Sequence, residues 1–226
     1  MREIHGKLLY DSIEEVVHPS HTALVVVDMQ NDTCSPDGAR VRRGSGITAI
    51  QKIIEPLGAL IEAARLSGVR IVYLMQTIEQ NLASAAPAWI YYCYRKRPVS
   101  GAPRMPLEVR VEGTWGHQII PDLAPEPSDF IIKKNRPSGF TSTNLDKILR
   151  ANGIESTVVA GIITAGCVLA TARDAQFHDY YTVVVKDCVA DNDPKMHEVG
   201  ITLLSDRCDV LCSKELITLW ANALIE

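Results

Sequence analysis

The sequence contains no apolar run near the roughly 18 residues that a membrane-spanning helix requires. Its N-terminus, MREIHGKLLYDSIEEVV, carries acidic residues early and has no apolar core of signal-peptide length. The net charge is −4, from 23 basic and 27 acidic residues, and no basic stripe or tail indicates nucleic-acid binding. The composition therefore predicts a cytoplasmic protein that binds neither membranes nor nucleic acid.

Cysteine and histidine are present, but without the spacing of a disulfide framework or a metal site. Cys208 and Cys212 are separated by four positions, yet no second Cys/His pair accompanies them. The histidines are scattered: His5, His18, His21, His117, His178 and His197. A chain of 226 residues can bury about 70% of its unfolded surface, so it needs neither disulfide nor metal to fold. We expect no metal site and no cofactor.

Short β-branched apolar runs alternate with segments of helical periodicity. The expected strands are residues 22–28, 69–76, 129–134, 156–161, 180–186 and 209–212. The expected helices are residues 47–67, 142–152, 167–179, 194–206 and 214–224, and Pro56 should kink or interrupt the first. This alternation predicts an α/β fold, with residues 1–226 forming one domain around an open, mainly parallel sheet covered by helices on both faces. No G-x-G-x-x-G follows the first of these strands, which argues against a dinucleotide-binding dehydrogenase.

A long stretch, residues 77–128, interrupts the alternation and is rich in proline, glycine and aromatic residues. Loops of this length inside a domain are usually functional or carry short elements of their own. Trp89, Tyr91, Tyr92 and Tyr94 could form a lid or a subunit interface. They could equally fill the core of the domain.

Three polar side chains stand where expected strands end. Asp28 and Lys134 close two strands, and Cys167 follows a tight turn after a third and opens a helix. Taken singly, Asp28 is also consistent with a cap, Lys134 with an exposed strand end, and Cys167 with a buried structural thiol. Because the carboxyl ends of parallel strands meet at one edge of a sheet, all three can face one crevice.

Together the three side chains form a plausible catalytic group. A thiol at a helix N-terminus feels the positive end of the helix dipole, and Lys134 can lower its pKa further. Asp28 can take the thiol proton and return it to a leaving amine. The exposed N–H groups at the helix start can bind the oxyanion of a tetrahedral intermediate.

Two segments resemble signatures of the isochorismatase-like hydrolases. ALVVVDMQND (23–32) is similar to their first-strand signature, and GIITAGCVLATARDA (161–175) to their nucleophile segment. The resemblance extends from about Thr22 to Ala190. It implies a six-stranded, mainly parallel sheet and a catalytic trio of Asp28, Lys134 and Cys167.

The same resemblance implies finer features of the site and the assembly. A cis peptide bond is expected between Ile162 and Ile163, with the backbone N–H groups of Ile163 and Cys167 forming the oxyanion hole. Members of this superfamily are commonly homo-oligomers, which implies a homodimer or homotetramer here.

The branch of the superfamily is indicated by KKNRPSGFTSTNLDKILRANGI (133–154), which resembles the ureidoacrylate and biuret-type enzymes. Two departures from the superfamily pattern stand out. Thr33 occupies the place where phenylalanine often follows DMQND, and QTIEQNLASAAP (76–87) lacks the histidines of metal-dependent nicotinamidases. The sequence therefore indicates a branch that uses no metal.

We predict a cysteine-dependent amidohydrolase that cleaves the C–N bond of a small carbamoyl or ureido amide through a thioester-type intermediate. Arg136, two residues beyond Lys134, is expected to offer its guanidinium to an anionic group of the substrate, although it could equally be a surface arginine paired with an acid. The alternatives are an isochorismatase-type C–O hydrolase, disfavoured by Cys167 because those enzymes commonly lack the cysteine, and a catalytically silent interaction protein on the same fold.

Overall fold

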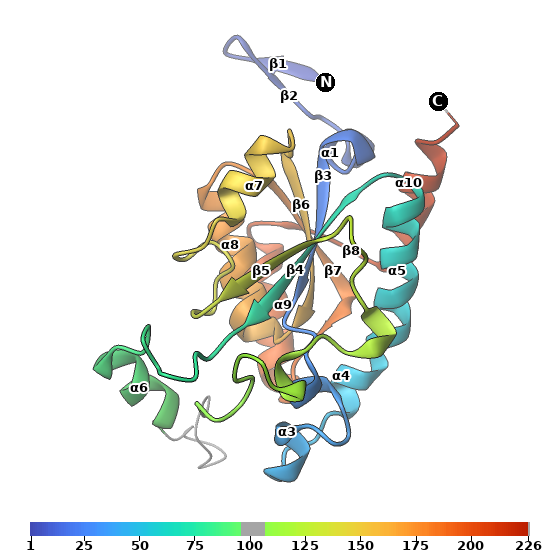
Figure 1. The fold of residues 1–226 in the computed structure, drawn as a ribbon. Helices are drawn as coiled ribbons and strands as arrows, with labels where there is room; N and C mark the ends of the chain where they lie inside the picture. The colour runs from blue at the N-terminus through green and yellow to red at the C-terminus, as the bar shows by residue number, and fades with distance from the viewer. Residues whose placement is uncertain (96–106, 226) are drawn as a thin grey trace.

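A six-stranded sheet forms the centre of the computed structural model, which describes residues 1–95 and 107–225 (Figure 1). Its strands are β3 (Thr22–Val27), β4 (Arg70–Gln76), β5 (Phe130–Lys134), β6 (Ser156–Ile162), β7 (Tyr181–Ala190) and β8 (Asp209–Leu211). The spatial order is β5-β4-β3-β6-β7-β8, and every neighbouring pair is parallel. The predicted α/β class and mainly parallel six-stranded sheet are confirmed.

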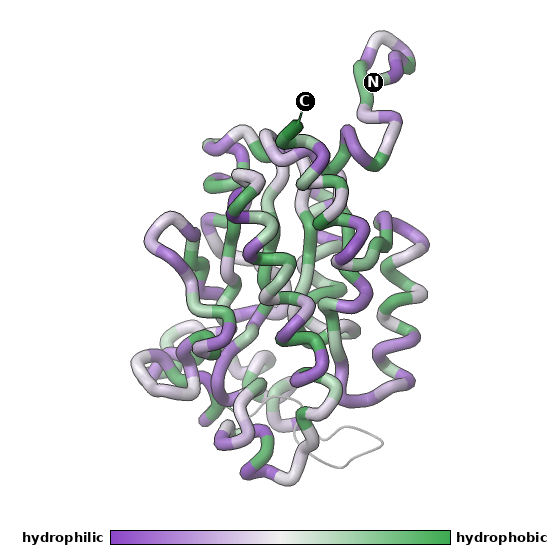
Figure 2. The backbone as a smooth tube through the Cα atoms, turned by 90° about the vertical axis from the view of Figure 1, so that its right-hand side faces the viewer, coloured by the Kyte–Doolittle hydropathy of each residue, from purple (hydrophilic) through white to green (hydrophobic). Residues whose placement is uncertain are grey.

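Helices cover both faces of the sheet because its central strands are apolar on both faces. Along β3, Leu24 and Val26 enter one hydrophobic cluster while Val25 and its alternating neighbours enter the other. The first cluster is covered by α5 (Ile54–Leu66) and α10 (Ser213–Asn222), and the second by α7 (Leu145–Ala151), α8 (Leu169–Phe177) and α9 (Pro194–Ser205). Figure 2 shows helices that alternate hydrophilic and hydrophobic residues, as one-sided burial requires.

The helical segment predicted over 47–67 is two helices, α4 (Thr48–Lys52) and α5. The break falls at Ile53, three positions before Pro56. Pro56 therefore lies in the first turn of α5, where an N–H group has no intrahelical acceptor and the missing proton costs little. The predicted interruption is real, and it lies just before the proline.

The connection from β6 to α8 carries the candidate nucleophile. The peptide bond Ile162–Ile163 is cis, as expected, and a single π-helical turn, η4 (Thr164–Val168), precedes α8. The predicted helix over 167–179 thus begins as a π turn. Helix α9 packs closely on this turn, since a Cβ atom at Gly200 would lie 3.0 Å from Thr164 Cγ2.

The elements that periodicity did not predict are all short. They are β1 (Arg2–Ile4), β2 (Lys7–Leu9), α1 (Ile13–Val16), η1 (Pro19–His21), α2 (Asn31–Cys34), α3 (Ala39–Arg42), α6 (Pro87–Tyr94), η2 (Trp115–His117) and η3 (Pro121–Leu123). Helix α6 and both later 3₁₀ turns belong to the 77–128 stretch, of which residues 96–106 lie outside the described residues. Within residues 1–95 and 107–225, no helix is long and apolar enough to cross a membrane.

Candidate active site

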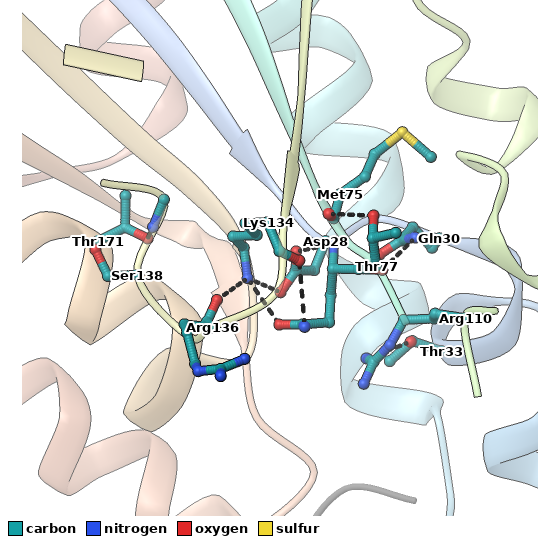
Figure 3. Close-up of polar contacts among 12 residues, drawn as sticks. Asp28, Gln30, Thr33, Met75, Thr77, Arg110, Lys134, Arg136, Ser138 and Thr171 are labelled. Atoms are coloured by element: carbon teal, nitrogen blue, oxygen red, sulfur yellow. Dashed lines mark hydrogen bonds and ion pairs between the residues drawn. The ribbon is translucent and has the colours of Figure 1, made fainter. Parts of the chain in front are cut away.

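The carboxyl edge of the sheet brings Asp28 and Lys134 into contact. Lys134 ends β5 and is 0% exposed, and its Nζ lies 2.9 Å from Asp28 Oδ2 (Figure 3). Asp28 follows β3 with φ 54°, in the left-handed region, where its backbone N–H donates to Leu74 O at 2.9 Å. These two strands flank β4, so the ion pair spans the end of the strand between them.

Gln76, the last residue of β4, completes this pair. Its backbone N–H donates to Asp28 Oδ1 at 2.9 Å, and its side-chain Oε1 accepts from Lys134 Nζ at 3.2 Å. Removing two charges from water is costly unless the pair is well oriented and makes further hydrogen bonds. Gln76 provides one such hydrogen bond to Asp28 and one to Lys134. Our sequence analysis missed Gln76, although it ends the predicted strand 69–76 at the same edge that singled out Asp28 and Lys134.

We expect Gln76→Leu to lower kcat by roughly tenfold with a much smaller change in KM, because Lys134 loses one acceptor of a charge-assisted hydrogen bond while the backbone donor to Asp28 remains. Steady-state kinetics measures the split. Gln80→Leu is the matched control, since Gln80 donates to Glu112 O from an exposed loop. Equal changes in both variants would show that Gln76 has no special role at the site.

Cys167 lies in the η4 turn and lines the same cavity as Asp28. Burial, and next the negative charge of Asp28, raise the pKa of the Cys167 thiol to about 12, and the opposing effect of Lys134 is smaller. The resting thiol is therefore protonated, which differs from the expectation that the helix start and Lys134 alone would favour the thiolate. A hydrogen bond to Asp28 contributes to the raised pKa, so this carboxylate is placed to receive the proton.

The cavity beside Cys167 has a volume of about 130 Å³, well below the roughly 300–1,000 Å³ of pockets that hold drug-sized ligands. It therefore suits a small compound. Its walls come from the ends of β3, β4 and β6, from the η4 turn, from the segments after β3 and β5, and from the 77–128 stretch, which includes α6. The lining residues are Asp28, Thr33, Arg40, Gln76, Trp89, Tyr92, Arg110, Pro137, Ile162, Ile163, Gly166 and Cys167.

The guanidinium of Arg136, which the sequence analysis expected to meet the substrate, contacts other parts of the chain in this structure. Its guanidinium donates to the carbonyl oxygens of Asn135 and Ser84, at 2.8 and 2.9 Å, and stacks over Trp89 at 4.7 Å. Among the described residues that line the cavity, Trp89 is present and Arg136 is not. Arg136 thus connects the segment after β5 to Ser84 and, through Trp89, to α6.

His18, His21, His117 and His197 make side-chain hydrogen bonds, and within the described part of the chain the histidines form no metal-binding cluster. His117 is buried with its Nε2 2.8 Å from Thr77 Oγ1, and His197 Nδ1 lies 2.8 Å from Thr164 Oγ1 at the start of the nucleophile turn. Residues 1–95 and 107–225 contain no group of three His, Cys, Asp or Glu side chains placed to hold an ion.

Fold and site together place a carboxylate, an ammonium and a thiol at the carboxyl edge of a parallel sheet, a set of groups that can support hydrolysis by a cysteine nucleophile. The sequence matches the isochorismatase domain family over residues 22–215. The chain belongs to the isochorismatase family.

Relatives and solved structures agree with this membership. The chain is 31% identical to ureidoacrylate amidohydrolase RutB of Caulobacter segnis over 183 residues, which cover 79% of this chain and 76% of the relative. It is 34% identical to the Agrobacterium fabrum protein of the same name, covering 75% of each. Its fold is similar to N-carbamoylsarcosine amidase of Thermoplasma acidophilum, with a TM-score of 0.64, 30% identity, and coverage of 85% of this chain and 96% of the other.

Proposed function

We propose that this protein is a cysteine-dependent amidohydrolase that cleaves a carbon–nitrogen bond, outside peptides, in a small ureido or carbamoyl amide. The observation that carries the proposal is that Asp28, held in a buried ion pair with Lys134, lines one small cavity together with Cys167. The similarity to proteins named ureidoacrylate amidohydrolase and N-carbamoylsarcosine amidase supports the ureido or carbamoyl class.

The reaction begins when Cys167 Sγ attacks the carbonyl carbon of the amide and its proton passes to Asp28. The backbone N–H groups of Ile163 and Cys167 stabilise the negative oxygen of the tetrahedral intermediate, which is formed next to the cavity wall that both residues line. The C–N bond breaks, Asp28 protonates the departing nitrogen, and a thioester-type intermediate remains on Cys167.

In the second half of the reaction a water molecule gives a proton to Asp28 and its oxygen attacks the thioester carbon. The C–S bond breaks, the thiolate recovers the proton from Asp28, and the acid product leaves. Lys134, 2.9 Å from Asp28, provides electrostatic support and holds the carboxylate in place through both steps. Every proton that moves is carried by Asp28, so no cofactor takes part in this mechanism.

A substrate panel tests the proposed function. Ammonia release is measured with ureidoacrylate, biuret, an N-carbamoyl amino acid and nicotinamide, and isochorismate hydrolysis is followed separately. We expect a ureido or carbamoyl compound to exceed nicotinamide and isochorismate by more than about tenfold in kcat/KM, a difference of about 1.4 kcal/mol in transition-state binding. Activity should survive dialysis against a strong chelator, because the described histidines form no ligand cluster.

Other outcomes of the panel would contradict the proposal in different ways. Preference for nicotinamide, with activity lost on chelation and restored by zinc, would place the protein with metal-dependent nicotinamidases. Preference for isochorismate would indicate C–O hydrolysis. No turnover of any compound would favour a catalytically silent interaction protein.

The proposal also covers the domain organisation, the oligomeric state and the cellular location of the protein. Residues 1–226 act as one hydrolase domain, with the 77–128 stretch contributing to the active-site cover through Trp89 and Tyr92. We further propose a homodimer or homotetramer, to be measured by light scattering at micromolar concentration. A cytoplasmic location is proposed because all six cysteines are free thiols, as a reducing compartment would keep them.

A further inference from the structure

Arg110 reaches the catalytic cavity from the second half of the 77–128 stretch. It lines the cavity with Cys167 and Asp28, and its Nη1 donates to Thr33 Oγ1 at 3.2 Å. Its backbone adopts a left-handed conformation with φ 61° and is held by a hydrogen bond from the N–H group to Asp32 Oδ2 at 2.7 Å. In Figure 3, Arg110 and Thr33 lie on one side of Asp28, and Lys134 and Arg136 on the other. The guanidinium is therefore fixed beside the reacting groups.

This guanidinium has no carboxylate partner within the chain segments that the structure describes. Arg110 takes part in none of the ion pairs of residues 1–95 and 107–225, and its buried Nε has no hydrogen-bond partner there. Residues 96–106 contain neither aspartate nor glutamate, so they offer no side-chain carboxylate. Partial burial of a cation without a counter-ion is unfavourable, and a negatively charged ligand would reduce that cost.

The charges around the cavity favour the same kind of ligand. Arg110 and Arg40 contribute two positive charges to its lining, and the one acidic side chain among the described lining residues, Asp28, is already paired with Lys134. A guanidinium fork matches the planar geometry of a carboxylate, and a cavity of about 130 Å³ leaves room for a small organic acid.

We propose that Arg110, oriented by Thr33, binds a carboxylate group of the substrate and makes the enzyme selective for amides that carry one. This inference rests on the proposed amidohydrolase function and assigns its substrate class. It gives Arg110 the role that the sequence analysis expected of Arg136, whose guanidinium is held by Asn135 O, Ser84 O and the Trp89 ring.

The test compares ureidoacrylate with its methyl ester, which keeps the ureido group and lacks the negative charge. Loss of a hydrogen bond to a charged group corresponds to a change of roughly 10- to 150-fold in an equilibrium constant. Arg110→Met should therefore raise KM for ureidoacrylate by roughly that factor and change KM for the ester by less than about threefold. Arg110→Lys should recover only part of the loss, since lysine keeps the charge without the fork.

Thr33 is tested as a positioning residue with a conservative pair. Thr33→Val removes the hydroxyl that accepts from Arg110 and should reduce the preference for the acid over the ester, whereas Thr33→Ser keeps that hydroxyl and should restore it. A purely structural role of Thr33 would instead change acid and ester equally.

Controls separate this inference from its rivals. Arg207→Met is the matched control, because Arg207 is exposed and pairs with the adjacent Asp206; it should leave the acid-to-ester ratio unchanged. Arg136→Met should change acid and ester by the same factor, through Trp89. A loss confined to the acid in Arg136→Met, with none in Arg110→Met, would overturn the inference.

Binding is measured apart from chemistry by titrating ureidoacrylate calorimetrically into Cys167→Ala and into Cys167→Ala with Arg110→Met. A Kd weakened at least tenfold in the double variant supports the inference, and equal Kd values overturn it. If wild-type enzyme cleaves the ester as well as the acid, the carboxylate inference is wrong while the amidohydrolase function stands. If wild type cleaves no ureido or carbamoyl compound, the proposed function itself fails.

Discussion

Cys167→Ala is expected to reduce kcat by at least about 10³-fold, to the level of background hydrolysis. The proposed mechanism requires a bond between the side chain at this position and the substrate carbon, and a methyl group can form none. Cys167→Ser should be nearly as inactive, because a hydroxyl is a much weaker acid than a thiol and Asp28 cannot readily take its proton. Ammonia release under saturating substrate measures both variants.

The fold should tolerate the loss of this sulfur, because Cys167 faces a cavity and is only partly buried, packing at the edge of a cluster. Circular dichroism and thermal unfolding should therefore resemble those of the wild type. Cys208→Ala provides the matched control, since Cys208 is also a partly buried free thiol at the edge of that cluster but does not line the catalytic cavity. If Cys167→Ala kept about a tenth of the activity, covalent catalysis would be excluded.

Asp28→Asn should lower kcat nearly as far while making the Cys167 thiol more acidic. An amide cannot carry the proton, so turnover is lost. Burial and, next, the charge of Asp28 raise the pKa of the thiol to about 12, whereas Lys134 lowers it. Without this carboxylate, the remaining effect of Lys134 shifts the thiol pKa below the wild-type value. At any pH below the wild-type pKa, the variant therefore contains more Cys167 thiolate than the wild type does.

Alkylation by iodoacetamide, followed by mass spectrometry between pH 7 and 10, measures this shift. Labelling of Cys167 should be faster in Asp28→Asn than in wild type over the lower part of that range. Asp122→Asn, a change at an exposed carboxylate in the η3 turn, should leave both labelling and turnover unaltered. A folded Asp28→Asn protein with slower labelling would show that Asp28 does not control the thiol.

The secondary structure was largely predictable because buried parallel strands leave a strong local signal. The run TALVVV in β3 is buried at every position, so each residue had to be apolar or small. Glycine and proline marked the ends of α5 and α7 and the start of α9. Short elements such as α6 gave no such signal, since eight residues complete barely two helical turns.

The candidate site was predictable only where it coincided with strand ends. Asp28 and Lys134 were found because parallel strands deliver their carboxyl ends to one edge, and the structure places them 2.9 Å apart although 106 residues separate them. Gln76 obeys the same rule and could have been found by applying it to the second strand. Arg110 obeys no such rule, because it lies in an irregular segment whose path the local sequence does not determine.

The sequence by itself determined the order of strands and helices, the apolar character of the sheet, and the edge at which catalytic groups gather, because these depend on periodicity and on the geometry shared by all parallel sheets. Only the tertiary structure decided which arginine faces the cavity. Arg136 lies two residues beyond Lys134, yet its guanidinium contacts Ser84 and Trp89, whereas the guanidinium of Arg110 binds Thr33, 77 positions away in the sequence. The direction of a side chain outside regular structure depends on contacts with distant segments, and those contacts exist only once the chain has folded.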